Sequence, residues 1–292
     1  MRGDSRNDLL VTTDLSLEGV HFRREWHPPE SVGHRCLVRG LSDIAAMGGE
    51  PTAAFLSLGL PAKTPQKWVD RFMTGFSALA RRYKVMLAGG DTAESPHGIG
   101  ADIIVIGRVP RGEAVLRSGA RAGNAIYVTG KLGASGAVLQ ELRAGRKPNP
   151  RAGANHRHFF PDPRVGIGEW LRRRGCVTAM IDLSDGLSTD LAHICQTSGV
   201  AAMVEQENLP LVADRQGKPD LHALHWGEDY ELLFTAPAKA KIPTEIGGVR
   251  VTHIGEILRA GRKPSVFLAD PQGRLRPLLA HGWQHFDKPR PS

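Results

Sequence analysis

Short runs of β-branched and apolar residues alternate with longer segments of helical periodicity throughout the chain. Such alternation is typical of α/β and α+β proteins, in which helices pack on a sheet. The apolar runs predict strands at residues 9–13, 52–60, 85–88, 102–109, 125–128, 177–181, 230–235 and 249–254. The periodic segments predict helices at residues 31–47, 134–144, 166–174 and 187–198, and another that begins at Pro65. We therefore expect a mixed α/β (α+β) fold.

The helix that begins at Pro65 has the clearest pattern. Thr64 is expected to cap it, because a threonine oxygen accepts hydrogen bonds from first-turn N–H groups and proline is favoured at the first helical position. Apolar residues recur at the spacing of one buried helical face, at Val69, Phe72, Phe76 and Leu79.

The length of 292 residues suggests two domains. Residues 110–115 contain a suitable join, after which the strand and helix pattern recurs, so we predict an N-terminal domain at residues 1–110 and a C-terminal domain at 111–292. The segment 145–163 is rich in Pro, Arg, His and Asn, and it is expected to be an exposed loop.

The charge and cysteine content exclude several classes of protein. The net charge is +8 and the pI is about 9.7, but the basic residues form short, scattered groups without aromatic interleaving, so we expect a solvated surface and no nucleic-acid partner. The three cysteines form no CxxC pair, which argues against a disulfide framework or a zinc site and favours a reducing cytoplasm. No apolar stretch approaches the roughly 18 residues that span a bilayer, and we expect no membrane association.

Four acidic clusters carry the chemical information. They are Thr12-Thr13-Asp14 at the end of the first strand, Ser42-Asp43 late in a helix, Gly89-Gly90-Asp91-Thr92 at the end of another strand, and Asp182 to Gly186 at the end of a fourth. Any one such Asp is more often a helix cap or a turn former. Together, these carboxylates and hydroxyls are the hard oxygen ligands that Mg²⁺ accepts along with substrate phosphates. The working hypothesis is a nucleotide-magnesium site.

The last cluster is the most suggestive. Asp182 and Asp185 flank the Ser184 hydroxyl at a three-residue spacing, so both carboxylates could face one metal, although a capping role for Ser184 or Asp185 stays open. There is no GxxxxGK[ST] loop and no nucleophile-elbow motif, which excludes the apparatus of P-loop enzymes and of α/β-hydrolases.

Seven segments, in the same order along the chain, resemble the thiamine-monophosphate kinase family. They are TTDLSLEGVHF, LSDIAAMGGEP, AGGDT, RSGARAGNAIYVTGKLG, IDLSDGLSTDL, GEDYELLFT and HGWQHF. They extend from about residue 9 to residue 286. The wider superfamily includes aminoimidazole ribonucleotide synthetase and selenophosphate synthetase, but the GVHF and GEDYELLFT segments are similar to the thiamine branch.

The resemblance implies an activity and an assembly. It implies a two-domain aminoimidazole ribonucleotide synthetase-like fold, with an N-terminal domain at residues 1–110 that binds ATP and magnesium and mediates dimerisation. The implied enzyme is a cytoplasmic homodimer that phosphorylates thiamine monophosphate to thiamine diphosphate with ATP. It is expected to use several Mg²⁺ ions and to form no phosphoenzyme intermediate.

The resemblance also implies roles for individual residues. The implied magnesium ligands are Thr12, Thr13, Asp14, Asp43, Asp91, Asp182 and Asp185. The implied ATP-binding residues are Gly90, Asp91, Arg117 and Ser184. The implied catalytic residues are Asp43, Asp182 and Arg117. The residues implied to hold thiamine phosphate are His21, Glu228 and Trp283; without the resemblance these three would be interpreted as a satisfied histidine, a surface carboxylate and a core tryptophan.

The chain departs from the family pattern at a few positions. Family members usually carry a Gly-Asp-Asp segment well upstream of the Thr-Thr-Asp strand, whereas eleven residues precede Thr12 here and Asp4 lies too close to take that role. We therefore expect either a missing start of the chain or a protein with fewer metal ligands. In addition, Gly40 and Asn124 stand where the family often has Asn and Asp.

Two alternatives follow from the same residues. One is a related ATP-using enzyme of the superfamily that acts on another small acceptor. The other is a noncatalytic nucleotide-binding homologue, which would bind magnesium-ATP without transferring phosphate. Nucleic-acid binding through the basic surface would instead predict salt-sensitive retention of DNA or RNA.

Overall fold

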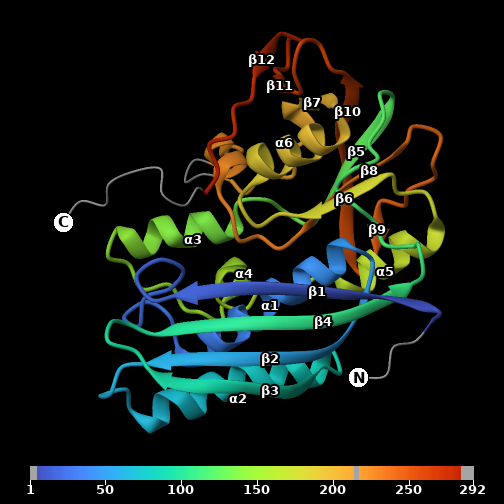
Figure 1. Cartoon of the computed structure of the whole chain (residues 1–292). Coiled ribbons are helices and arrows are strands. Elements are labelled where there is room, and N and C mark those ends of the chain that lie inside the picture. The colour runs from blue at the N-terminus through green and yellow to red at the C-terminus, as the bar shows by residue number, and fades with distance from the viewer. Residues whose placement is uncertain (1–4, 214–216, 284–292) are drawn as a thin grey trace. The chain divides into compact units, whose positions relative to one another are not determined.

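The computed structural model describes residues 5–213 and 217–283 (Figure 1). The contacts within the chain divide it into two compact units, of which the first contains residues 1–114 and 141–173 and the second contains residues 115–140 and 174–292. The division after Ala114 lies close to the predicted join. The segment 141–173, which lies within the predicted C-terminal domain, belongs by its contacts to the first unit.

The first unit has a four-stranded sheet in the order β1-β4-β2-β3. Its strands are β1 (Asn7–Leu17), β2 (Glu50–Leu60), β3 (Met86–Glu94) and β4 (Gly100–Pro110). β1 and β2 pair antiparallel with β4, and β2 pairs parallel with β3. The long helices α1 (Pro29–Ala46) and α2 (Gln66–Arg82) pack together on one side of this sheet (Figure 1).

The open face of the four-stranded sheet presents apolar side chains. Alternate residues of β1 point away from α1, and Leu9, Val11 and Leu15 are 65%, 60% and 50% exposed. At the other edge of the sheet, Met86 of β3 is 66% exposed. The described residues of this unit therefore leave one face of the sheet uncovered.

The sequence pattern located α2 well but missed its first residue. Phe72, Phe76 and Leu79 are buried, as the spacing predicts, whereas Val69 is only partly buried. The prediction that Thr64 caps the helix is wrong: the helix begins at Gln66, the extended Pro65 is its N-cap, and no side-chain hydrogen bond caps it among the described residues. Pro65 is the N-cap and not the first helical residue, so Thr64 lies outside the helix and away from the first-turn N–H groups.

The segment 145–163 is not wholly an exposed loop. It contains a short 3₁₀ turn at Gly153–Asn155 and the helix α4 (His156–Phe159), and it precedes α5 (Val165–Arg174). His158 and Phe159 are buried. The hydroxyl of Ser31 on α1 donates to the Phe159 carbonyl at 2.8 Å, so tertiary packing on α1 overrides the polar composition.

The second unit has an eight-stranded sheet in the order β12-β11-β7-β10-β5-β8-β6, with β9 paired to β10. Its strands are β5 (Asn124–Thr129), β6 (Ala179–Asp182), β7 (Val200–Glu205), β8 (Leu232–Pro237), β9 (Glu245–Ile246), β10 (Val249–Arg259), β11 (Val266–Ala269) and β12 (Leu275–Pro277). All neighbours are antiparallel except β7 and β11. The 3₁₀ turns are Gln206–Asn208 and Leu221–His225, and α3 (Ala134–Arg143) begins in this unit.

Helix α6 (Leu187–Ser198) matches its predicted bounds and lies between β6 and β7 in the chain. Leu187, Leu191, Ile194 and Cys195 recur at helical spacing and join the core of the second unit. The helix thereby presents its first turn at the end of β6, where Asp182 lies.

Asn124, a departure from the family pattern, has a structural role. Its buried side-chain oxygen accepts hydrogen bonds from the Arg121 N–H at 3.0 Å and from the Thr178 hydroxyl at 2.7 Å. Asn124 thus keeps the acceptor oxygen that an Asp at this position would also supply.

Candidate functional site

The candidate residues lie in both units. In the first unit, the Thr12 hydroxyl donates a hydrogen bond to the Asp43 carboxylate and so joins β1 to α1. Asp14 lies on the same face of β1 as Thr12, because side chains alternate along a strand. Burial raises the pKa of the Cys36 thiol to about 12, and the nearby negative charges of Asp14 and Asp102 add to this effect while Arg39 opposes it. Thr12 thus contacts Asp43 of α1, while Asp14 lies on the same face of β1, near Cys36 two helical turns earlier on α1.

Gly40 permits this arrangement. A Cβ atom at Gly40 would lie 2.4 Å from Cγ2 of Val105 and 3.4 Å from Cγ2 of Thr12. Such a contact with Val105 is far shorter than van der Waals packing allows. The departure from the family pattern at Gly40 thus fits a close approach of α1 to the sheet in this chain.

Thr13 points to the opposite face of β1. It is exposed, and its hydroxyl donates to the Asp102 carboxylate of β4 at 3.2 Å. The structure does not bring this hydroxyl to the face of β1 that carries Thr12 and Asp14. Thr12-Thr13-Asp14 also lies inside β1, not at its end, because pairing with β4 continues to Leu17.

Gly90 and Asp91 lie on β3, at the edge of the sheet opposite β1. Asp91 is exposed and aligns with Ser57 of β2, which in turn aligns with Asp102 of β4. Three strand spacings separate β3 from β1, which is about 14 Å. Within the first unit, Asp91 is therefore separate from Thr12 and Asp14 of β1. The Gly-Gly-Asp-Thr segment is also within its strand and does not end it.

His21 follows β1 in a tight turn. The Leu17 N–H donates to Nδ1 of His21 at 2.9 Å, and the His21 N–H donates to the Leu17 carbonyl at 2.9 Å. The imidazole is thus oriented by the main chain of β1.

In the second unit, Asp182 is the last residue of β6 and is 3% exposed. The loop after it pairs with the segment 227–231. The Glu228 N–H donates to the Ser184 carbonyl at 2.9 Å, and the Tyr230 N–H donates to the Leu183 carbonyl at 3.0 Å. Glu228 and Tyr230 both have positive φ, at 65° and 52°, a strained backbone conformation that is concentrated at functional sites. Glu228 is therefore held beside Ser184.

The C-terminal HGW segment packs on the same loop. The Trp283 N–H donates to the Asp185 carbonyl at 3.1 Å, and the Gly282 N–H donates to the Thr189 hydroxyl at 3.0 Å. A Cβ atom at Gly282 would lie 2.2 Å from the Asp185 carbonyl oxygen, so only glycine fits. Trp283 is 45% exposed, which contradicts its interpretation as a core tryptophan. Segments far apart in the sequence thus bring Ser184, Asp185, Glu228 and Trp283 together.

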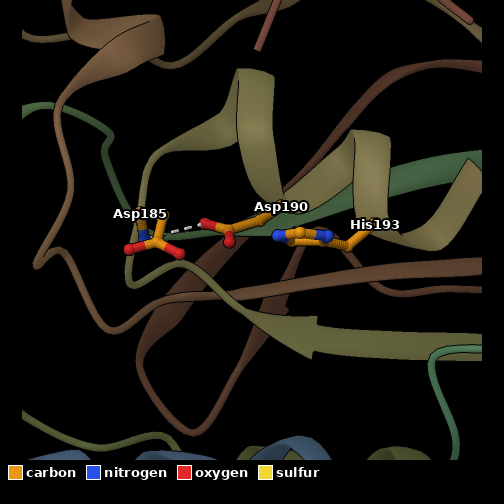
Figure 2. A group of neighbouring side chains, drawn as sticks. All are labelled: Asp185, Asp190 and His193. Carbon is orange, nitrogen blue, oxygen red and sulfur yellow. Dashed lines mark hydrogen bonds between the residues drawn. The ribbon is translucent and has the colours of Figure 1, made fainter. Parts of the chain in front are cut away.

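Asp190 is a carboxylate at this site that sequence reasoning missed. Its side chain lies between Asp185 and His193, and one ligand atom from each of the three lies within 4.8 Å of the others (Figure 2). Burial, followed by the negative charges of Asp182 and Asp185, raises the pKa of Asp190 well above its ordinary value. The available signal was the position of Asp190 in the first turn of the helix that follows the Asp182 to Gly186 cluster.

Arg117 lies elsewhere in the second unit. Its carbonyl accepts hydrogen bonds from the Thr197 and Ser198 hydroxyls, at 3.1 and 3.3 Å, at the C-terminal end of α6. Asp185 lies at the other end of this helix, about 18 Å away along an axis of twelve residues. The structure does not bring the main chain of Arg117 to the loop of Asp185.

Comparisons with known proteins place this geometry in a family. The model of the AIR synthase related protein, N-terminal domain, matches residues 1–109. The thiamine-monophosphate kinase of Salmonella typhimurium is 37% identical over 264 residues, which cover 86% of this chain and 79% of that protein. The thiamine-monophosphate kinase of Bacillus subtilis is 35% identical over 293 residues, which cover 95% of this chain and 88% of that protein. The chain belongs to the thiamine-monophosphate kinase family. The resemblance stated from the sequence motifs is thereby confirmed.

The fold of the family is also confirmed. A solved structure described as AaThiL complexed with AMPPCP and TMP has a TM-score of 0.83 and 33% identity, and the similarity covers 98% of this chain and 89% of that one. The mixed α/β architecture agrees with the predicted aminoimidazole ribonucleotide synthetase-like fold. Among the described helices, none has the length and apolar composition that crossing a bilayer requires.

Proposed function

We propose that this chain is an ATP-dependent thiamine-monophosphate kinase that transfers a phosphoryl group directly to thiamine monophosphate. The observation that carries the proposal is the similarity, over 98% of the chain, to a relative complexed with AMPPCP and TMP. The meeting of Ser184, Asp185, Glu228 and Trp283 in the second unit supports it, because the sequence motifs assign these residues to ATP, metal and acceptor.

The chemistry of the acceptor agrees with a site rich in carboxylates. The second pKa of a phosphate monoester is about 6, so the acceptor is mostly a dianion near neutral pH and needs no strong general base. The obstacle is repulsion between two polyanions. Each pair of unit charges about 4 Å apart contributes roughly 1 kcal/mol in water and roughly 4 kcal/mol at an effective dielectric of about 20.

The donor set fits magnesium. Asp182 is buried. Burial first, and then the negative charges of Asp182 and Asp185, raise the pKa of Asp190, and a divalent cation would relieve the repulsion among these carboxylates. The residues that we propose to hold several Mg²⁺ ions are Thr12, Thr13, Asp14, Asp43, Asp91, Asp182 and Asp185. When bound, Mg²⁺ would neutralise phosphate charge and orient the phosphates.

The residues of this chain then bind and align the two substrates. Gly90, Asp91 and Ser184 would contact ATP, with Arg117 as a fixed cation, and His21, Glu228 and Trp283 would hold thiamine monophosphate. Because the acceptor oxygen is already ionised, Asp43 and Asp182 would act as ligands and not as bases. Catalysis would consist of alignment in line with the γ-phosphorus and of charge neutralisation, without a phosphoenzyme.

We also propose that two copies pair through the open face of the four-stranded sheet. Leu9, Val11, Leu15 and Met86 leave apolar area in water that a second copy would bury. A face that meets itself around a twofold axis gives a closed dimer. A cytoplasmic location stays a prediction, based on the unpaired cysteine pattern.

The test is an assay of the purified full chain with ATP, MgCl₂ and thiamine monophosphate, with chromatographic detection of thiamine diphosphate. The proposal expects product only when all three are present. Transfer to another small phosphate or hydroxyl acceptor, and not to thiamine monophosphate, would favour the related superfamily enzyme. Binding of magnesium-ATP without transfer to any acceptor would favour the noncatalytic homologue.

A further inference from the structure

Asp190 combines deep burial with an unusual pair of contacts. It lies in the first turn of α6, and the residue is 1% exposed. One oxygen, Oδ2, accepts hydrogen bonds from the main-chain N–H of Asp185 at 3.1 Å and from that of Gly186 at 3.0 Å. The side chain therefore reaches back from the helix to the loop before it (Figure 2).

These two contacts determine the course of the loop. N–H groups at the start of a helix have no partner within the helix, and Gly186, the N-cap, has no side chain to supply one. The return contact from Asp190 resembles the second half of a capping box, in which an acidic residue in the first turn bonds the N-cap N–H. Since two consecutive N–H groups point to the same oxygen, the main chain of Asp185 is held in one orientation.

The two hydrogen bonds place an acceptor oxygen of Asp190 directly under the main chain of Asp185. They hold the turn at a residue that is proposed to bind metal.

Thr189, the residue before Asp190, holds the C-terminal segment in a similar way. The Thr189 hydroxyl accepts the Gly282 N–H at 3.0 Å, and Gly282 precedes Trp283. Thus Asp190 contacts the loop of Asp185, while Thr189 contacts the segment that presents Trp283. The first turn of α6 therefore contacts both the loop of Asp185 and the segment of Trp283.

We infer that Asp190 is a positioning residue that orients the Asp185 carboxylate for divalent-cation binding by holding the Asp185 and Gly186 N–H groups. This inference rests on the proposed function, since it deepens the role of Asp185. Asp190 acts through Asp185 and does not itself contact a substrate. Thr189 provides the matched control, because it lies in the same helical turn but its hydroxyl contacts the C-terminal segment and not the Asp185 loop.

The experiment compares the full chain with Asp190→Ala, Asp190→Asn and Thr189→Val. Mn²⁺ binding is measured by electron paramagnetic resonance in the presence of AMPPCP, and melting temperatures are recorded for all four proteins. Asp190→Ala loses both hydrogen bonds, and we expect Mn²⁺ affinity to fall about 10- to 100-fold. Asp190→Asn keeps an acceptor oxygen, and its affinity should stay within about threefold of the unchanged protein. Thr189→Val should bind Mn²⁺ normally and instead raise the KM for thiamine monophosphate.

Three results would overturn the inference. They are unchanged Mn²⁺ binding by folded Asp190→Ala, a loss in Asp190→Asn as large as that in Asp190→Ala, and an equal loss in Thr189→Val. If Asp190→Ala does not fold, Asp190→Leu takes its place, because leucine is close to asparagine in shape but has no acceptor oxygen; normal Mn²⁺ affinity in folded Asp190→Leu would overturn the inference. Failure of the proposed function looks different: the unchanged chain would make no thiamine diphosphate, while the Mn²⁺ comparison would still report on Asp190.

Discussion

The main-chain N–H of Trp283 donates a hydrogen bond to the carbonyl of Asp185 at 3.1 Å. This contact attaches the C-terminal segment to the loop that follows β6 and leaves the indole 45% exposed. An exposed aromatic ring beside a carboxylate-rich loop is a surface on which an organic acceptor can stack.

Replacement of Trp283 by Ala tests that role. The main-chain bond to Asp185 is retained, so the loop should stay in place while the aromatic surface is lost. We expect the KM for thiamine monophosphate to rise about tenfold, with little change in the KM for ATP. Trp283→Phe should recover most of the affinity. Steady-state kinetics with each substrate varied in turn would decide, and an equal rise in both KM values would contradict the assignment.

Asp43→Asn and Asp182→Asn are each expected to abolish magnesium-dependent transfer. Both carboxylates would hold metal, and an amide is a poor ligand for Mg²⁺. The matched control is Asp162→Asn, which removes a partly exposed ion pair with Arg82 and should leave turnover unchanged. Circular dichroism would check the fold of each variant. Retained turnover in both site variants would rule out the metal roles.

The space at Gly40 predicts a compensating pair of substitutions. Gly40→Ala places a methyl group 2.4 Å from Cγ2 of Val105, and we expect a loss of about 1–3 kcal/mol of unfolding free energy. Activity should fall as well, because a shift of α1 separates Asp43 from Thr12. Adding Val105→Ala should restore part of both quantities. Urea unfolding and the kinase assay measure them, and equal stability of Gly40→Ala and the unchanged chain would refute the close approach.

The open sheet face predicts the oligomeric state. Val11 is 60% exposed, so Val11→Asp should be tolerated in a monomer but should disrupt a self-complementary apolar interface. Light scattering coupled to size exclusion should show a dimer for the unchanged chain and a monomer for Val11→Asp. Leu275→Asp, at a residue of β12 that is 54% exposed, serves as a control and should remain dimeric. A monomeric unchanged chain would disprove the pairing.

His34 predicts a loss of stability in acid. Burial lowers its pKa from 6.5 to about 4, and its Nε2 atom lies 2.7 Å from the Pro161 carbonyl oxygen. Because the pKa is lower in the folded state, the unfolded state binds the proton first. This contribution to stability is complete above pH 6.5 and is lost as the pH falls towards 4. It amounts to about 3 kcal/mol at most.

His34→Gln should therefore flatten the change in unfolding free energy between pH 6.5 and pH 4, as measured by urea titration at each pH. The control is His97→Gln, since His97 lies in an exposed turn and should leave the pH profile unchanged. Parallel profiles for His34→Gln and the unchanged chain would exclude His34 as the source of the slope.

Local signals were sufficient where one segment determines its own structure. Gly186 and Gly199 flank α6, and Gly199 has the left-handed conformation of a helix C-cap, so the predicted bounds 187–198 were right. The strands β7, β9, β11 and β12 were missed, since their short runs carry little periodic signal. The segment around Phe159 was misassigned because its burial depends on α1, which no local pattern reports.

The candidate site shows the same division. The sequence by itself determined the alternation of strands and helices, the family and the set of acidic residues. Only the tertiary structure decided that Thr12 meets Asp43 while Thr13 faces away, that Trp283 lies on the loop of Asp185, and that Asp190 supports this loop. The physical reason is that propensity and periodicity act over a few neighbouring residues, whereas these contacts depend on how closely distant backbones pack. At Gly40 and Gly282, the absence of a side chain allows the backbone to approach its neighbour this closely.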